Sequence, residues 1–396
     1  MAKPLEGLKV IDHTTALSGP FCTMMLADYG ADVIKIEAPA GDQSRYWAPV
    51  HKASGESEYF AVFNRNKRDV CINLKDPEGV ALFYDLVKEA DILVENYRGG
   101  VTKKLSIDYE SVKAVNPSII YASLTGFGQT GPYAQHPCYD IVAQAMSGLM
   151  MLSGYPGQEP IKACPSIIDQ VSGIYMMNGI LLALHHRERT GEGQFVDVAM
   201  LDSAFSLMEN YPSLVSMGHD APERSGNRDA SISPFDAFPC KDGYVVISAG
   251  TEKLWKAFCQ TAGLEELLDD PRYADNQSRT DHYLSSLKEQ ITNWCMQRTK
   301  TEIETLLEDA GVPSSAVLTI SESVRHPQIL ARDMVQKTEH PLIGEFETTG
   351  CVVKLSETPG EIKTPAPLLG QDNREILGLS EEEEQRLIEK GVLGKR

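Results

Sequence analysis

The sequence lacks several patterns that would place it in common protein classes. Its eight cysteines include no C-x-x-C pair and no spacing typical of a metal site, so we expect no bound metal and reduced thiols in the cytoplasm. The N-terminal region lacks an apolar signal core, which favours the same compartment. The longest apolar stretch, residues 171–184, is shorter than the roughly 20 residues of a membrane span. We therefore expect a buried helix there and no membrane contact.

Positive charge is also scarce. The 37 Lys and Arg residues stand against 56 Asp and Glu residues, a formal net charge of −19. The electrostatic field of a negatively charged protein repels nucleic acid and anionic membranes, so neither is expected as a partner. One window differs, because residues 64–75 contain Arg65, Lys67, Arg68 and Lys75. This window is either a solvated basic surface or a site for phosphate groups.

A nicotinamide-binding fingerprint is missing too. The first expected strand-to-helix turn, residues 14–20, reads TTALSGP and contains no G-x-G-x-x-G, which disfavours dinucleotide binding. A helix that follows this turn still directs its first N–H groups toward the turn. Such a helix start can stabilise an anion or a developing oxyanion.

The length and the order of patterns predict the domain organisation. A chain of 396 residues exceeds the size at which one core usually divides, so we expect two domains. In the first 200 residues β-branched runs alternate with helical patterns, which predicts a mainly parallel sheet. The expected strands cover residues 9–12, 32–37, 70–74, 91–95 and 118–123. The expected domains are a large Rossmann-like α/β domain over 1–217 and 339–396, a linker over 218–231 and a smaller α/β domain over 232–330.

A glycine-rich loop and a single acid suggest the chemistry. The loop over residues 124–133 (LTGFGQTGPY) leaves the carboxyl end of the strand expected at 118–123, where open α/β sheets bind ligands. Residues 139–148 follow, and Asp169 then stands alone at the head of the apolar helix. A carboxylate in that position acts either as a nucleophile or as a helix cap.

Several blocks together carry a family resemblance. They are residues 7–12 (GLKVID), 30–37 (GADVIKIE), 66–68 (NKR), 95–96 (EN) and 189–194 (RTGEGQ). In this order they resemble the class III CoA-transferase family (CaiB/BaiF type). The blocks RSGNR at 224–228, PFD at 234–236 and APLLGQ at 366–371 are most similar to its formyl-CoA:oxalate and acetyl-CoA:oxalate branch.

The resemblance implies a reaction and an assembly. CoA passes from an acyl-CoA to a carboxylic acid, expected here to be a small acid such as oxalate, formate or succinate. Asp169 is the implied nucleophile, through an aspartyl anhydride and an aspartyl-CoA thioester. Acyl-CoA is then a substrate, no permanently bound cofactor is expected, and the chain forms an interlocked homodimer.

Two alternatives stay open beside this reaction. One is an acyl-CoA racemase or isomerase of the same fold, although Tyr139 stands where the racemases carry histidine. The other is a non-catalytic acyl-CoA-binding protein, which could dispense with Asp169.

Further site residues are implied by the same resemblance. Those expected to bind CoA are Thr15, Ala16, Lys75, Asn96, Tyr97, Arg98 and Lys104. Those expected to line the acyl pocket are Leu17, Ser18, Tyr139 and Asp140, with backbone amides around Ala16 and Ser18 facing the oxyanion. Basic residues of the family are replaced by Ala38 and Pro137, so the candidates for phosphate or adenine contacts are Arg45, Arg65, Arg68 and Arg98. A glycine run that closes over the site in formyl-CoA transferase is reduced to residues 248–251 (SAGT). Whether a loop gates the site stays open.

Overall fold

The structure is a computed structural model that describes residues 3–395. The chain divides into two compact units. Unit 1 consists of Met1–Leu149, Lys162–Pro212 and Pro327–Arg396, and unit 2 consists of Met150–Ile161 and Ser213–His326. The domain assignment predicted from the sequence stays a prediction.

Unit 1 is built on one six-stranded parallel sheet. Its strands are β1 (Lys9–His13), β2 (Asp32–Glu37), β3 (Lys67–Cys71), β4 (Ile92–Glu95), β5 (Ile120–Thr125) and β6 (Phe195–Ala199). They lie in the order β3-β2-β1-β4-β5-β6, which is the strand order of Rossmann folds. Each of the five expected strands overlaps an observed strand, although β3 begins and ends earlier than predicted and β5 begins and ends later. The sixth strand, β6, is not among the five expected ones.

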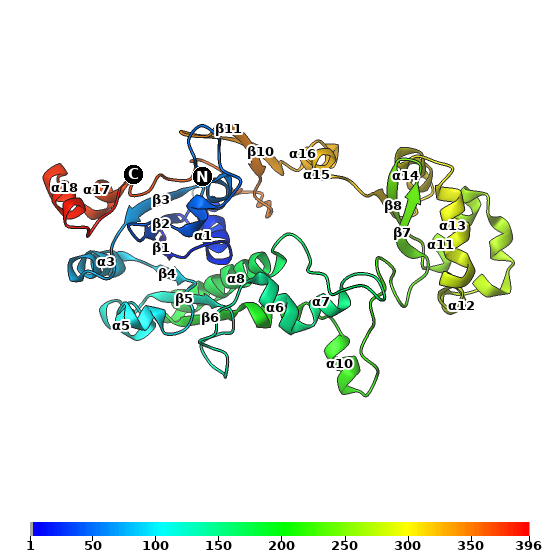
Figure 1. Ribbon diagram of the computed structural model, residues 1–396, viewed down its shortest axis with the longest axis horizontal. Helices are drawn as coiled ribbons and strands as arrows, with labels where there is room; N and C mark the ends of the chain where they lie inside the picture. The colour runs from blue at the N-terminus through cyan, green and yellow to red at the C-terminus, as the bar shows by residue number, and fades with distance from the viewer. Residues whose placement is uncertain (1–2, 396) are drawn as a thin grey trace. The chain divides into compact units, whose positions relative to one another are not determined.

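Helices cover both faces of this sheet. Successive strand residues point to opposite faces, so Val10 packs with helices α1 (Ser18–Asp28) and α8 (Ile167–Thr190), while its neighbour Ile11 belongs to the opposite core. The helices of that second core are α3 (Pro77–Glu89), α5 (Tyr109–Val115) and α18 (Glu381–Glu389). The result is a three-layer α/β/α unit whose main elements are labelled in Figure 1.

Helix starts follow their sequence signals. Asp76 accepts a hydrogen bond from the Glu78 N–H at 2.8 Å, and Pro77 occupies the first helical position of α3. Ser380 and Glu383 form the expected capping box of α18. Both predicted starts are confirmed.

The long apolar helix α8 differs from its prediction. One side, with Met176 and Ile180, is buried in the core of unit 1, but the other side is not, and Leu182 is 72% exposed. The expectation of a buried helix is therefore confirmed for one side only. The helix is also longer than the apolar stretch suggested. By length and composition alone it could cross a membrane, a test that core helices of soluble proteins also pass.

Unit 2 has a smaller antiparallel sheet of its own. Its strands are β7 (Phe235–Cys240), β8 (Gly243–Ser248) and β9 (Ser314–Ala316), and its longer helices are α11 (Glu252–Ala262), α13 (Lys288–Cys295) and α14 (Lys300–Asp309). The turn after β8 is tied to the core of this unit, since the buried Arg279 donates hydrogen bonds to the carbonyl oxygens of Gly250 at 2.9 Å and Ser233 at 2.8 Å. This turn contains the SAGT stretch.

The remaining elements are short. They are α2 (Glu58–Phe63), α4 (Val101–Lys104), α6 (Asp140–Ser147), α7 (Leu149–Leu152), α9 (Met200–Ser206), α10 (Tyr211–Ser216), α12 (Asn276–Asp281), α15 (Ile320–Ser323), α16 (Pro327–Ala331), β10 (Val335–His340), β11 (Gly344–Thr349) and α17 (Asn373–Leu377). The C-terminal segment, red in Figure 1, returns to β3 at the edge of the large sheet. There the Asn373 side chain accepts a hydrogen bond from the Cys71 N–H at 2.9 Å.

A fully buried ion pair lies beneath the first turn of unit 1. The Lys67 ammonium contacts the Asp12 carboxylate at 2.8 Å, and neither side chain is exposed. Burial alone raises the pKa of Asp12, but Lys67 and Lys35 outweigh burial and lower this pKa to about 2. Lys67 belongs to the basic window of residues 64–75, and its charge pairs with a buried acid of the protein.

Replacing one partner of this pair is expected to destabilise unit 1 strongly. Lys67→Met leaves the Asp12 carboxylate buried without its cation, which should lower the free energy of unfolding by about 3–5 kcal/mol. Urea denaturation measures this loss. The matched control is Lys9→Met, because Lys9 pairs with Glu89 at a surface where the side chains are 46% and 71% exposed. A surface pair contributes about 0–1 kcal/mol, so equal losses in the two variants would contradict the expectation.

Candidate active site

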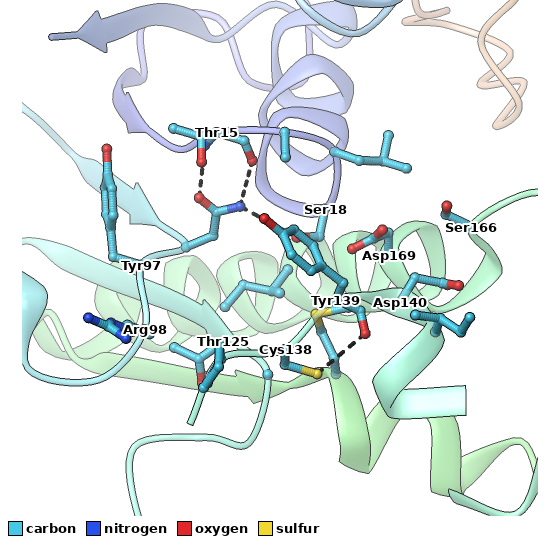
Figure 2. Close-up of a pocket in the computed structure, with 18 of the residues that line it drawn as sticks. Thr15, Ser18, Tyr97, Arg98, Thr125, Cys138, Tyr139, Asp140, Ser166 and Asp169 are labelled. Atoms are coloured by element: carbon cyan, nitrogen blue, oxygen red, sulfur yellow. Dashed lines mark hydrogen bonds between the residues drawn. The ribbon is translucent and has the colours of Figure 1, made fainter. Parts of the chain in front are cut away.

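A pocket of about 470 Å³ opens at the carboxyl ends of β1, β4 and β5. Its walls come from the loops that follow these strands and from the starts of α1, α6 and α8, all within unit 1 (Figure 2). Open α/β sheets bind ligands at this edge. The glycine-rich loop predicted to do so contributes Leu124, Thr125 and Gly126 to the lining.

Asp169 lies in the first turn of α8 and points into the pocket in Figure 2. Burial, and after it the charge of Asp140, raises the pKa of Asp169 to about 7. A helix start favours the anionic form of a carboxylate, but here burial and Asp140 outweigh that effect. The carboxylate therefore stays partly protonated near neutral pH and is a stronger base than an ordinary aspartate.

The turn after β1 is held in place by side chains from two other segments. The Asn96 side chain accepts a hydrogen bond from the Thr15 N–H and donates one to the Thr15 carbonyl oxygen, both at 2.8 Å (Figure 2). Ala16 has a φ of 68°, a left-handed conformation that is unfavourable for alanine. Its N–H donates to the Asp42 carboxylate at 3.3 Å. The Ala16 N–H expected to face an oxyanion is thus engaged within the protein.

The start of α1 offers other donors at the same place. Leu17 precedes the helix and provides no side-chain cap, so the first N–H groups of α1 receive no acceptor from it. Leu17 and Ser18 both line the pocket. An oxyanion bound here would meet the amides of this first turn.

Three of the four candidate arginines are paired with acids. Arg45 pairs with Glu37, Arg65 with Asp28 and Arg68 with Asp32. Their guanidinium groups therefore hold elements of unit 1 together. Arg98 lines the pocket and, within residues 3–395, forms no ion pair, so it is the candidate best placed for a ligand phosphate.

Most of the predicted site residues come together in this pocket. The lining includes Thr15, Ala16, Leu17, Ser18, Asn96, Tyr97, Arg98, Tyr139, Asp140 and Asp169. Lys75 and Lys104 are exposed and lie outside the lining, before α3 and at the end of α4. A role for these two lysines in binding CoA stays a prediction.

Sequence reasoning missed other residues of the lining. They are Gln43, Trp47, Tyr59, Cys138, Ile141, Lys162, Ser166 and Met200. Burial and then the charge of Asp169 raise the pKa of Tyr59, so this hydroxyl lies within the field of the candidate nucleophile. The sequence signal for this wall is a pair of aromatic residues, Tyr59 and Phe63, whose rings lie 4.9 Å apart in the structure. The sequence does not show which of the two faces the pocket.

Comparisons with known proteins identify the family. A model of CoA-transferase family III matches residues 5–373. The chain is a class III CoA-transferase. A solved structure of a CaiB/BaiF family protein from Brucella suis has the same fold as this class III CoA-transferase, with a TM-score of 0.86 at 33% identity over 96% of this chain and 99% of that chain.

Two curated relatives of this class III CoA-transferase have named activities. The succinate–glutarate CoA-transferase of Agrobacterium fabrum is 37% identical over 94% of this chain and 95% of its own. The acetyl-CoA:oxalate CoA-transferase of Acetobacter aceti is 40% identical over 91% of this chain and 92% of its own. Because the two relatives have similar sequence identity to this chain, the comparisons do not distinguish the predicted oxalate branch from transferases that act on longer acids such as glutarate.

Proposed function

We propose that this class III CoA-transferase moves CoA between small dicarboxylic acids and that Asp169 is its nucleophile. The observation that carries the proposal is the half-buried Asp169 carboxylate in a pocket at the carboxyl edge of the sheet. Its pKa of about 7 suits a nucleophile that must act near neutral pH. The names of the two relatives support dicarboxylates as the class of acid.

The proposed reaction proceeds in four balanced steps. The Asp169 carboxylate attacks the thioester carbonyl of the donor, which gives a mixed anhydride and releases the CoA thiolate. The thiolate attacks the Asp169 carbonyl, which gives an aspartyl-CoA thioester and frees the donor acid. The acceptor carboxylate then attacks this thioester, giving a second anhydride and the thiolate. The thiolate finally attacks the acceptor carbonyl and restores the Asp169 carboxylate.

Each residue around Asp169 has a proposed part. The amides at the start of α1, near Leu17 and Ser18, stabilise the oxyanion of each tetrahedral intermediate. Thr15, Tyr97 and Arg98 bind CoA on one side of the pocket. Tyr139, which is 63% exposed, faces the acyl group.

Cations at the pocket support a dicarboxylate substrate. Lys162 and Arg98 are both part of the lining. A dicarboxylic acyl group keeps one carboxylate after thioester formation, and that charge needs a cationic partner. We propose Lys162 for this contact, because it shares the pocket wall with Ser166 and Asp169.

Replacing the nucleophile is expected to abolish transfer. Asp169→Asn and Asp169→Ala should reduce CoA transfer to background while CoA still binds, because the cofactor contacts lie elsewhere. Wild-type protein incubated with acyl-CoA should yield a hydroxylamine-trapped adduct at Asp169, located by mass spectrometry. The amide variant should be at least as stable at pH 8, since burial disfavours the ionised carboxylate that it removes. Transfer by Asp169→Asn at the wild-type rate would refute the mechanism.

The acid class is tested with matched acceptors. With succinyl-CoA as donor, dicarboxylates of two to five carbons should exceed monocarboxylates of equal length by about tenfold or more in kcat/KM, the effect of one charged hydrogen bond. Lys162→Met should remove this preference. Faster transfer to monocarboxylates, or α-proton exchange in D₂O without CoA transfer, would contradict the proposal. The second outcome would indicate a racemase instead.

We also propose that the protein is a homodimer. The exposed side of α8 presents the large apolar side chains of Ile174, Tyr175, Leu181 and Leu182. Exposed apolar residues that gather on one element are typical of an interaction surface. Light scattering on gel-filtered protein should give twice the 43.6 kDa chain mass at every measurable dilution, as expected of interlocked chains. Leu182→Lys should disturb the assembly, whereas Leu306→Lys on α14 is the control on another exposed apolar residue. A folded monomer at micromolar concentration would refute the interlocked dimer.

A further inference from the structure

The Asp140 carboxylate borders the pocket, but both of its oxygens bind the protein. Asp140 is the first residue of α6 and is only 5% exposed. Its Oδ1 accepts a hydrogen bond from the Ile168 N–H at 2.8 Å, and its Oδ2 accepts one from the Gln144 side-chain amide at 2.6 Å. These contacts direct Asp140 toward α8, the helix that carries the nucleophile, instead of toward a substrate.

Asp140 supplies the side-chain acceptor that the start of α8 otherwise lacks. Ser166 is the N-cap residue of α8, and its side chain makes no capping hydrogen bond. The first N–H groups of a helix need acceptors, and a carboxylate satisfies them best because it also opposes the positive end of the helix. Asp140 provides that acceptor from another helix, at the residue immediately before Asp169. It therefore fixes the turn on which Asp169 stands.

Gln144 extends this contact to the segment before α8. Its Oε1 accepts a hydrogen bond from the Ala163 N–H at 2.8 Å, and its Nε2 donates to the Ala163 carbonyl oxygen at 3.2 Å. Gln144 is fully buried. Through Asp140 and Gln144, α6 holds the chain at Ala163 and at Ile168.

The groups that face Asp169 differ in charge. Tyr59 on α2 and Cys138 in the loop before α6 are neutral at pH 7, since burial raises the pKa of both, that of Cys138 to about 11. The lining also contains the cationic residues Arg98 and Lys162, together with His136. Asp140 is the acid whose charge acts on Asp169, and a second negative charge disfavours ionisation of the first.

We propose that Asp140 is a positioning residue of the transfer reaction, which fixes the first turn of α8, and with it Asp169, through its hydrogen bond to the Ile168 N–H. Its negative charge also opposes ionisation of Asp169 and so makes that carboxylate more basic. The inference rests on the proposed role of Asp169 as nucleophile. A more basic carboxylate attacks a thioester more readily once it is ionised. Asp140 thus acts on the substrate only through Asp169.

The test measures the pH dependence of succinate release, which accompanies formation of the aspartyl-CoA thioester, in a single turnover with succinyl-CoA and no acceptor. In wild type the rate should rise with pH with a midpoint near 7, the pKa at which Asp169 ionises. Asp140→Asn has the same size and keeps an acceptor for the Ile168 N–H, but it removes the charge. Its midpoint should move about one unit toward acid, and its rate above the midpoint should fall. Asp140→Ser also removes the charge, and it should show the same shift of the midpoint if Asp140→Asn folds poorly.

Three further variants separate charge from position. Asp140→Glu keeps the charge and should keep the wild-type midpoint. Gln144→Leu removes the contacts to Ala163 and the hydrogen bond to the Asp140 Oδ2 but leaves the Asp140 charge, so it should lower the maximal rate at an unchanged midpoint. Ser147→Ala is the control on the same helix. The Ser147 hydroxyl donates to the Gln144 carbonyl oxygen and accepts from the Leu149 N–H, and it makes no hydrogen bond to α8 within residues 3–395, so neither quantity should change.

Distinct outcomes overturn distinct claims. An unchanged midpoint in both neutral variants would overturn the role of the charge, and wild-type rates in them would overturn the role of Asp140 altogether. Failure of the nucleophile assignment has a different signature, since the trapped adduct of the wild-type protein would then map to a residue other than Asp169.

Discussion

The buried carboxylate of Asp12 is the group on which the pocket depends. It pairs with Lys67 of β3 and accepts hydrogen bonds from the Thr14 N–H at 3.1 Å and from the Thr23 hydroxyl of α1 at 2.7 Å. One residue at the end of β1 thereby sets the turn, the following helix and a strand two positions away in the sheet. Hydrophobic residues could replace such a pair without loss of stability, so its main effect is to define one arrangement of these elements.

A second buried pair continues this arrangement toward the ligand. Lys35 of β2 donates to the Thr14 carbonyl oxygen at 2.8 Å and pairs with Asp42 at 3.1 Å. Asp42 in turn holds the N–H of Ala16, whose left-handed backbone is unfavourable by about 1–3 kcal/mol. The geometry of the turn is therefore maintained by charges that never meet the substrate. In the same way, Asp140 holds the backbone at the start of α8 through its hydrogen bond to the Ile168 N–H.

Local patterns predicted much of the fold but only part of the site. Alternating strand and helix signals located β1 to β5, and Asp76, Pro77 and the Ser380 capping box located the helix starts, because these signals act within a few residues. The arginines could not be assigned in this way. Whether Arg65 meets a phosphate or Asp28 depends on residues 37 positions apart that only the folded sheet brings together. Asp140 and Ile168, 28 positions apart, are a further example.

The return of the C-terminal segment to β3 has a consequence for synthesis of the protein. Asp372 and Asn373 satisfy backbone groups of Asp69 and Cys71 on this edge strand, and the last of these contacts joins residues 302 positions apart. At about 5–20 residues per second, a ribosome needs roughly 15–60 s to cover that distance. During this interval the outer edge of β3 has no covering segment, and an open strand edge can pair with other chains. The nascent enzyme is therefore open to strand pairing with other chains after its first strands have formed and before its last helices have been made.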